Sequence, residues 1–176
     1  MTRMILVALL LASLMGCSGS DYAYENRKLW IDTEAFSDEE VAAIRASLDE
    51  WCSVTDGWSC IDELTDRPSE VGGKTRTGIV TAAEECSRLA IAHNGSVTFC
   101  RSTIEGQAKV FGSSTADVIG SVMLHETGHL FHLRDLRDSE YSGHVMFWQL
   151  NDVKLSLQED DVAQYCAVNT SAPVCK

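Results

Sequence analysis

The chain has 176 residues, and its 14 basic and 26 acidic residues give a formal net charge of −12 at pH 7. This balance argues against nucleic acid as a partner, because phosphate backbones are bound by clusters of lysine and arginine. It also disfavours strongly acidic substrates. About 160 residues remain after an N-terminal leader is removed, which is enough for one domain with its own hydrophobic core.

The N-terminus has the composition of an export signal. Arg3 supplies a positive charge, and residues 4–15 form an apolar run that is too short to span a membrane comfortably. The sequence L-M-G-C at residues 14–17 resembles a bacterial lipoprotein box, which implies cleavage before Cys17 and lipidation of that cysteine. A plain signal peptide and a short uncleaved anchor are the alternatives. We therefore expect a signal peptide over residues 1–16, a lipidated tether over 17–27 and a single domain over 28–176.

These features imply a lipoprotein of the bacterial cell envelope, at the outer membrane or the cell surface. The membrane is contacted only through the N-terminal lipid, and we expect a monomer. The cysteines agree with export, because six of the seven remain when Cys17 is set aside, and an even number outside the cytoplasm indicates disulfides. Zinc ligation by these cysteines is disfavoured, since no C-x-x-C spacing is present. Pairing of nearest neighbours, which closes short loops, is expected: Cys52–Cys60, Cys86–Cys100 and Cys166–Cys175.

The first part of the domain alternates between strand and helix signals. Residues 27–31 are expected to form a strand. The capping box Ser37-x-x-Glu40 opens an amphipathic helix over residues 38–52, in which apolar residues recur at helical spacing. Residues 53–75 are rich in glycine and turn residues and are expected to form a loop.

The next segments predict more strands and then two helices. A short β-rich run covers residues 77–81. Asn94-Gly95 is a strong hairpin signal, and it lies between β-rich segments at residues 88–92 and 96–104. Two helices complete the predicted order, one over about residues 115–131 after an N-cap at Ser114 or Thr115, and one opened by the capping box Ser156-x-x-Glu159 and running to about 168.

The most informative motif lies in the helix expected over residues 115–131. It is H-E-T-G-H at residues 125–129, which has the H-E-x-x-H spacing of zinc-dependent hydrolases. His125 and His129 are one helical turn apart on one face, so their imidazole nitrogens can converge on one metal ion. Glu126 projects about 100° around the helix, where its carboxylate can act as a general base toward water. A pair of hydrogen-bonded core histidines is the alternative, and it leaves Glu126 unexplained.

A catalytic zinc ion needs a third protein ligand, and the chain offers several. Asp135 lies ten positions after His125. His132 continues the histidine face but lies about 10 Å further along the helix axis than His125, too far to share the metal. His144 and Asp138 are fallback ligands. Glu159, at the start of the last helix, would instead complete a gluzincin-type site.

The stretch from residue 125 to residue 146 resembles the metzincin zinc metalloproteases, and especially their matrixin and snapalysin-like members. The residues that carry this resemblance are the H-E-T-G-H motif, Asp135, and the segment S-G-H-V-M at residues 142–146. The resemblance implies that zinc is held by His125, His129 and Asp135, and that Met146 forms a Met-turn beneath the metal. The family has glycine where this chain has His132, at the left-handed turn that ends the helix.

The resemblance also implies an α+β fold, a metzincin-type zincin domain. Such a domain has a small, twisted, mostly parallel sheet, an active-site helix, a Met-turn and a C-terminal helix. Peptide substrate is expected to lie extended along an edge strand. Residues 77–82 and residues 96–104 are the two candidates for that edge.

The expected function is that of a zinc-dependent endopeptidase, which hydrolyses peptide bonds by metal-activated water with Glu126 as general base. Its partner is a peptide or protein substrate. No prodomain of the usual kind is evident, so the enzyme is either made active or restrained by a separate protein inhibitor. Three alternatives remain: a gluzincin-type site, a zinc hydrolase acting on a non-protein amide, and a non-catalytic zinc-binding surface lipoprotein.

Overall fold

The computed structural model describes residues 27–72 and 75–176. The expected signal peptide, the lipidated Cys17 and the tether up to residue 26 lie outside these ranges. Within them, no helix combines the length and the apolar character needed to cross a membrane.

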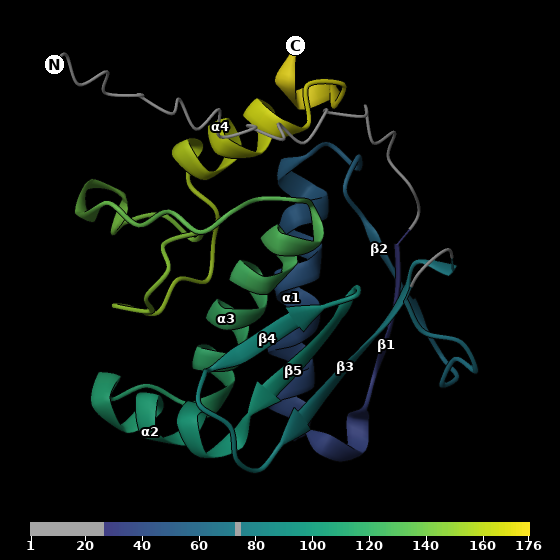
Figure 1. Cartoon of the computed structure of the whole chain (residues 1–176), viewed down its shortest axis with the longest axis vertical. Helices are drawn as coiled ribbons and strands as arrows, with labels where there is room; N and C mark the ends of the chain where they lie inside the picture. Colours follow the sequence, from purple (N-terminus) through teal and green to yellow (C-terminus); the bar gives the residue numbers. More distant parts are fainter. Residues whose placement is uncertain (1–26, 73–74) are drawn as a thin grey trace, which may run out of the picture.

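A five-stranded sheet forms one layer of the domain (Figure 1), with the strand order β2-β1-β3-β5-β4. Neighbouring strands run parallel except β4, which pairs antiparallel with β5. The fold is thus α+β with a mostly parallel sheet, as the sequence predicts. The strands are β1 (Arg27–Ile31), β2 (Ile61–Leu64), β3 (Thr77–Ala83), β4 (Ala90–His93) and β5 (Ser96–Cys100).

Two long helices form the second layer (Figure 1). They are α1 (Asp38–Val54) and α3 (Thr115–Leu130), which pack against each other and against one face of the sheet. The face that they cover carries apolar side chains at alternating strand positions, as period-2 geometry requires. Its buried members are Leu29, Ile31, Val80, Val97 and Phe99.

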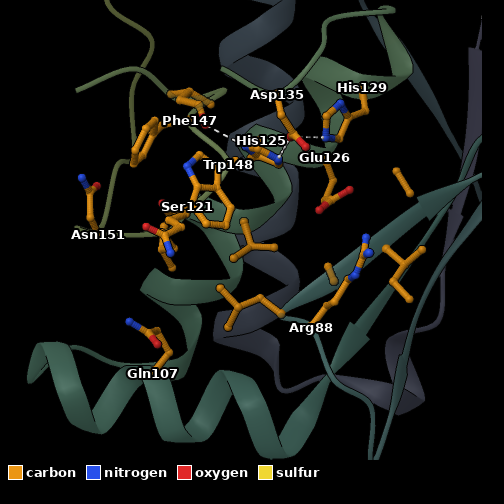
Figure 2. A pocket seen from close by; sticks show the side chains of 18 of the residues that line it. Arg88, Gln107, Ser121, His125, Glu126, His129, Asp135, Phe147, Trp148 and Asn151 are labelled. Carbon is orange, nitrogen blue, oxygen red and sulfur yellow. Dashed lines mark hydrogen bonds and ion pairs between the residues drawn. The ribbon is translucent and has the colours of Figure 1, made fainter. Parts of the chain in front are cut away.

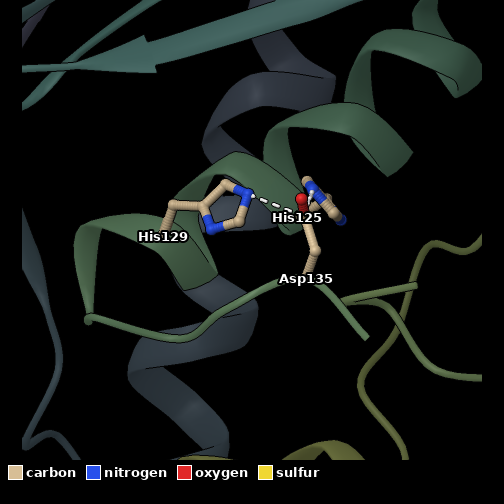
Figure 3. A group of neighbouring side chains, drawn as sticks. All are labelled: His125, His129 and Asp135. Carbon is tan, nitrogen blue, oxygen red and sulfur yellow. Dashed lines mark ion pairs between the residues drawn. The ribbon is translucent and has the colours of Figure 1, made fainter. Parts of the chain in front are cut away.

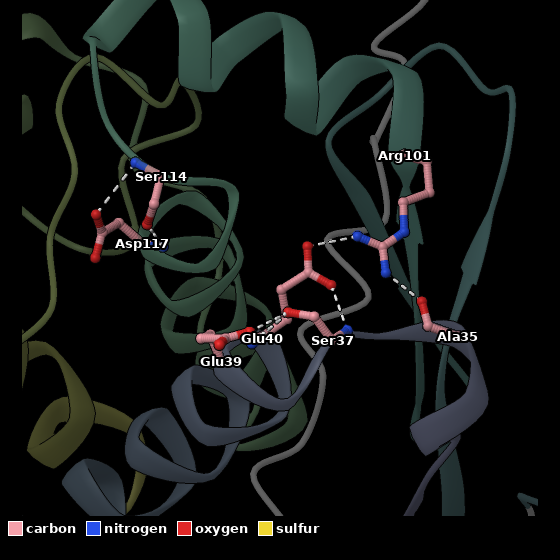
Figure 4. A network of polar contacts seen from close by, with 7 residues as sticks. All are labelled: Ala35, Ser37, Glu39, Glu40, Arg101, Ser114 and Asp117. Atoms are coloured by element: carbon pink, nitrogen blue, oxygen red, sulfur yellow. Dashed lines mark hydrogen bonds and ion pairs between the residues drawn. The ribbon is translucent and has the colours of Figure 1, made fainter.

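Both long helices begin with the caps that the sequence predicts (Figure 4). The Ser37 hydroxyl accepts a hydrogen bond from the Glu40 backbone, and the Glu40 carboxylate accepts one from the Ser37 backbone. Ser114 and Asp117 form the same reciprocal pair at the start of α3. Each cap satisfies backbone N–H groups that have no partner within the helix.

A third helix, α2 (Arg101–Phe111), occupies a position where the strand of residues 96–104 was expected to continue. The expected strand is correct only up to Cys100. Ile104 and Ala108 are buried at helical spacing, and Gly112 ends α2 in the left-handed conformation with φ 65°. Residues 96–100 are rich in β-forming residues, and this composition led to the prediction that the strand continues. The apolar spacing in fact changes from that of a strand to that of a helix after Cys100.

Arg101 fastens the start of α2 to the start of α1 (Figure 4). Its Nη1 atom lies 2.6 Å from Oε1 of the buried Glu40. Its guanidinium also donates to the Ala35 carbonyl and lies 5.1 Å from the centre of the Phe36 ring. This ion pair holds in place the helix that forms one end of the cavity described below.

Two other predictions need correction. Residues 53–75 are not all loop, because residues 61–64 form the edge strand β2, whose I-D-E-L sequence lacks an alternating apolar pattern. The last helix, α4 (Glu159–Val168), is capped by Gln158 and Asp161 rather than by Ser156.

The disulfide prediction, in contrast, is confirmed. The three disulfides join the cysteine pairs expected from nearest-neighbour loops: Cys52–Cys60, Cys86–Cys100 and Cys166–Cys175.

Candidate active site

Helix α3 presents His125 and His129 on one face, with their ring centroids 4.7 Å apart (Figure 3). Nδ1 of His125 lies 2.8 Å from the carbonyl oxygen of Val145, and Nδ1 of His129 lies 2.9 Å from that of Leu133. A carbonyl only accepts, so each Nδ1 carries its proton and donates it. Both Nε2 atoms are thereby turned toward the same point, the arrangement in which histidines bind metals.

Asp135 completes a group of three side chains at this point (Figure 3). Its Oδ1 atom lies 3.4 Å from Nε2 of His125 and 3.3 Å from Nε2 of His129. Neighbouring ligand atoms of a tetrahedral zinc ion, each bonded at about 2.0–2.1 Å, are about 3.3–3.4 Å apart. The three residues therefore fit zinc, and they form the one metal-ligating group of this kind in the described part of the chain.

The end of α3 brings Asp135 back toward the histidines. The His132 N–H donates to the His129 carbonyl, and the Leu133 N–H donates to the Gly128 carbonyl, each at 3.0 Å. These two bonds form a Schellman motif, which requires a left-handed residue between them. His132 takes this conformation with φ 67°, although glycine is the residue that adopts it without steric cost. Helix α3 thus ends in a left-handed turn although the residue there is not glycine.

Met146 lies directly beneath this turn. Its side chain is fully buried and packs against Gly128, where an added Cβ would overlap the methionine sulphur. The Met146 carbonyl accepts from the Leu136 N–H at 2.8 Å, and the Leu136 carbonyl accepts from the Trp148 N–H at 3.0 Å. The segment that follows Asp135 is therefore hydrogen-bonded to the segment around Met146, and the two form one structural unit.

Asp161 of α4 supports the same unit from below. Its side chain is fully buried, and its Oδ1 atom accepts from the Val145 N–H at 2.7 Å. The Val145 carbonyl is in turn the partner of His125 Nδ1. In the sequence, Asp161 is one of two adjacent aspartates in the expected last helix, with nothing to distinguish it from Asp160. In the structure, it is the third residue of α4, where it also caps the helix.

Glu126 lies beside the three-residue group, with only 7 % of its surface exposed. Burial raises the pKa of its carboxyl above the ordinary value, against the effect of His125 and His129, which lower it. The pKa of the Asp135 carboxyl is lowered instead, chiefly by its hydrogen bond with His125. The surroundings thus shift the pKa values of the two carboxyl groups in opposite directions. This difference suits Asp135 to remain ionised and Glu126 to exchange a proton.

The other ligand candidates lie outside this group. His144 faces α4, with Nδ1 3.6 Å from Asp161 and Nε2 3.9 Å from Asp160. Glu159 begins α4 and is exposed, as is Asp138 at the start of the short 3-10 helix Ser139–Tyr141. The structure therefore brings Asp135, and none of the fallback residues, to the two histidines.

A cavity of about 840 Å³ opens beside Glu126 and the three-residue group (Figure 2). One wall contains strand β4 and the residues just before it, and the opposite wall is formed by residues 145–154. Strand β4 is an edge of the sheet, whereas β3 and β5 are interior. The expected edge at residues 77–82 or 96–104 is therefore wrong, because the Asn94-Gly95 hairpin folds β4 back outside β5.

Comparison with known proteins leaves the family open. No family model matches the chain, and no curated protein matches it. One similar solved structure is that of a zinc-dependent peptidase from Methanocorpusculum labreanum, which is 13% identical in sequence with a TM-score of 0.48. The match covers 80% of this chain and 100% of that chain.

Proposed function

We propose that this chain is a zinc-dependent endopeptidase of the metzincin type. The observation that carries the proposal is the convergence of three ligand atoms, Nε2 of His125, Nε2 of His129 and Oδ1 of Asp135, within 4.8 Å of one another. Glu126, whose buried carboxylate is itself no member of that group, lies beside them and lines an open cavity. Two neutral imidazoles and one carboxylate are ligands that zinc prefers.

The residues of the site would have distinct roles in peptide-bond hydrolysis. Zinc bound by these three residues would polarise a peptide carbonyl and lower the pKa of a water molecule. Glu126 takes the proton from the attacking water and passes it to the leaving amine. The carbonyls of Val145 and Leu133 hold the two imidazoles in the orientation that leaves Nε2 free for the metal.

The edge strand β4 supports peptide rather than a small amide as the substrate. An extended peptide can add to an exposed sheet edge by backbone hydrogen bonds, and β4 borders the cavity at Ala90, Ile91 and Ala92. The backbone of Ala92 in this strand acts to lower the pKa of the Glu126 carboxyl, and both residues line the cavity, so the strand lies near the reacting groups.

A structural zinc site is the competing function from a different class. Structural zinc is usually held by four protein ligands, whereas catalytic zinc keeps a position open for water. Three ligating residues converge within the described part of the chain, and they border a cavity instead of a closed core. A structural zinc ion needs no general base, so a structural site would not explain the buried carboxylate of Glu126 beside the three ligands.

We also propose that the enzyme acts outside the cytoplasm on a lipid anchor. The support is the lipoprotein-like box at residues 14–17 together with the three disulfides. A Cys17→Ser variant should lose incorporation of labelled fatty acid and leave the membrane fraction. Retention of both the label and the membrane association would refute the anchor.

Hydrolysis of denatured protein tests the proposed activity. Purified protein loaded with zinc should cleave a denatured protein, and a chelator should stop the cleavage. Glu126→Gln should keep its zinc and lose turnover by roughly a thousandfold, because general acid–base catalysis contributes about 10²–10⁴-fold. Glu105→Gln, an exposed position on α2, is the matched control and should behave as the wild type. Full turnover by Glu126→Gln would exclude the mechanism.

A further inference from the structure

The cavity beside the candidate metal site carries more positive charge than the chain as a whole. Three basic residues line it, Arg88, Arg137 and Lys154, and its two acidic residues, Glu126 and Asp135, both belong to the site itself. The full sequence has nearly twice as many acidic residues as basic ones. The net charge of the residues that line the cavity is therefore positive, whereas the net charge of the whole chain is negative.

Lys154 is the basic residue most firmly placed in this wall. Its backbone N–H donates to the hydroxyl of Ser121, a buried residue of α3 one turn before His125, at 2.9 Å. Its Nζ atom donates to Oδ1 of Asn151, another lining residue, at 3.0 Å. The lysine is thus held along the same helix face that carries the histidines, with its ammonium group beside a neutral amide.

The ammonium group of Lys154 lacks part of its hydration. Burial lowers its pKa, while Asp152 and Asp161 act through space in the opposite direction and with less effect. A partly desolvated cation gains from a carboxylate that replaces the lost water, because charge-assisted hydrogen bonds are about twice as strong as neutral ones. The structure offers it only the amide of Asn151 as a hydrogen-bond acceptor among the described side chains.

The other two cations of the cavity are more exposed than Lys154. Arg88 precedes β4 and lies on the Glu126 side of the cavity, opposite Trp148 and Asn151 (Figure 2). Arg137 follows Asp135 by two residues and contributes to lowering the pKa of that carboxyl. Both are exposed, so they strengthen the local field more than they fix a ligand in place.

The overall negative charge does not cancel this local field. The Debye length is about 8 Å at physiological ionic strength, so acidic groups on distant surfaces are largely screened from the cavity. Inside a concave site with protein walls, screening is weaker and the nearest charges dominate. The expectation that acidic substrates are disfavoured, which rests on net charge alone, therefore does not extend to this cavity.

We propose that the cavity selects peptides with a glutamate or aspartate side chain next to the scissile bond, and that Lys154 is the main contact of that carboxylate. This inference rests on the proposed peptidase function and names its substrate class. The cavity lining also includes the apolar residues Val122, Phe147 and Leu150, which can pack against the methylene groups of an acidic side chain.

Matched peptides test the selectivity. Three peptide series carry glutamate, glutamine or lysine at each position around a single cleavage site, and kcat/KM is measured for each. The wild type should prefer glutamate over glutamine by about tenfold at the position that meets Lys154. Lys154→Gln should remove this preference, and Lys154→Glu should shift it toward lysine. Lys109→Glu changes the net charge equally on an exposed part of α2 outside the cavity, and it should keep the preference.

Two outcomes would overturn the inference: equal cleavage of the three series by the wild type, or an unchanged preference in Lys154→Gln. The zinc content of each variant reports whether the site is intact. If no peptide is cleaved by zinc-loaded protein, the proposed function itself fails. Binding of the labelled glutamate and glutamine peptides to the Glu126→Gln chain, followed by fluorescence anisotropy, then still decides whether the cavity prefers the acidic side chain.

Discussion

The buried carboxylate of Asp161 accepts a hydrogen bond from the backbone N–H of Val145 at 2.7 Å. Because the Val145 carbonyl also holds His125 at 2.8 Å, helix α4 is connected to the candidate metal site through one residue. The C-terminal helix is therefore part of the support of the site, although none of its side chains belongs to the three-residue group.

Removal of the Asp161 carboxylate should weaken both stability and zinc binding. Asp161→Ala leaves the N–H of the buried Val145 without its acceptor, which should cost about 2 kcal/mol of unfolding free energy. Zinc affinity, measured by competition with a chelator, should fall by about tenfold or more, since His125 loses its fixed orientation. Asp160→Ala removes a neighbouring side chain that is 81% exposed and should change neither quantity. Equal behaviour of the two variants would contradict the connection.

The contact between Gly128 and Met146 predicts a size limit at residue 128. Gly128→Ala introduces a Cβ that overlaps the methionine sulphur, and overpacking of this kind should lower the unfolding free energy by about 1–3 kcal/mol. A double-mutant cycle with Met146→Ala should recover part of the loss, because the smaller side chain removes the overlap. Gly106→Ala on α2, where a Cβ would meet nothing within 4 Å, should be neutral or stabilising. Additive effects in the cycle would show that the two residues do not compete for the same space.

The left-handed conformation of His132 predicts that a glycine variant at this position is more stable than an alanine variant. Alanine at this position keeps the steric cost of φ 67°, and glycine removes it. His132→Gly should therefore be more stable than His132→Ala by about 1 kcal/mol in urea unfolding. The reverse order, which is the usual one inside helices, would mean that the Schellman turn is not formed in solution.

Much of this architecture can be predicted from local sequence patterns. The capping box at Ser37 and the N-cap expected at Ser114 or Thr115 place the starts of two helices correctly, because such side chains satisfy nearby backbone donors. Asn94-Gly95 places the hairpin for a related reason, since both residues take positive φ angles, 49° and 83°. Signals of this kind act over a few residues and need no knowledge of the tertiary structure.

The features that escaped prediction depend on distant contacts. Strand β2 is short and polar, and it exists only through its pairing with β1. Asp161 acquires its importance from Val145, a residue of the loop that α4 packs against. Asp135 is an intermediate case. Its spacing from His125 is visible in the sequence, but the left-handed turn that brings it to the histidines has His132 in place of the glycine that would mark such a turn.

The zinc content of Asp135→Ala tests the central claim most directly. The wild-type protein, purified and dialysed against zinc-free buffer, should retain about one zinc ion per chain. Asp135→Ala should retain far less, while Asp138→Ala, an exposed aspartate three residues later, should retain as much as the wild type. An undiminished zinc content in Asp135→Ala would contradict the account and place the third ligand elsewhere in the chain.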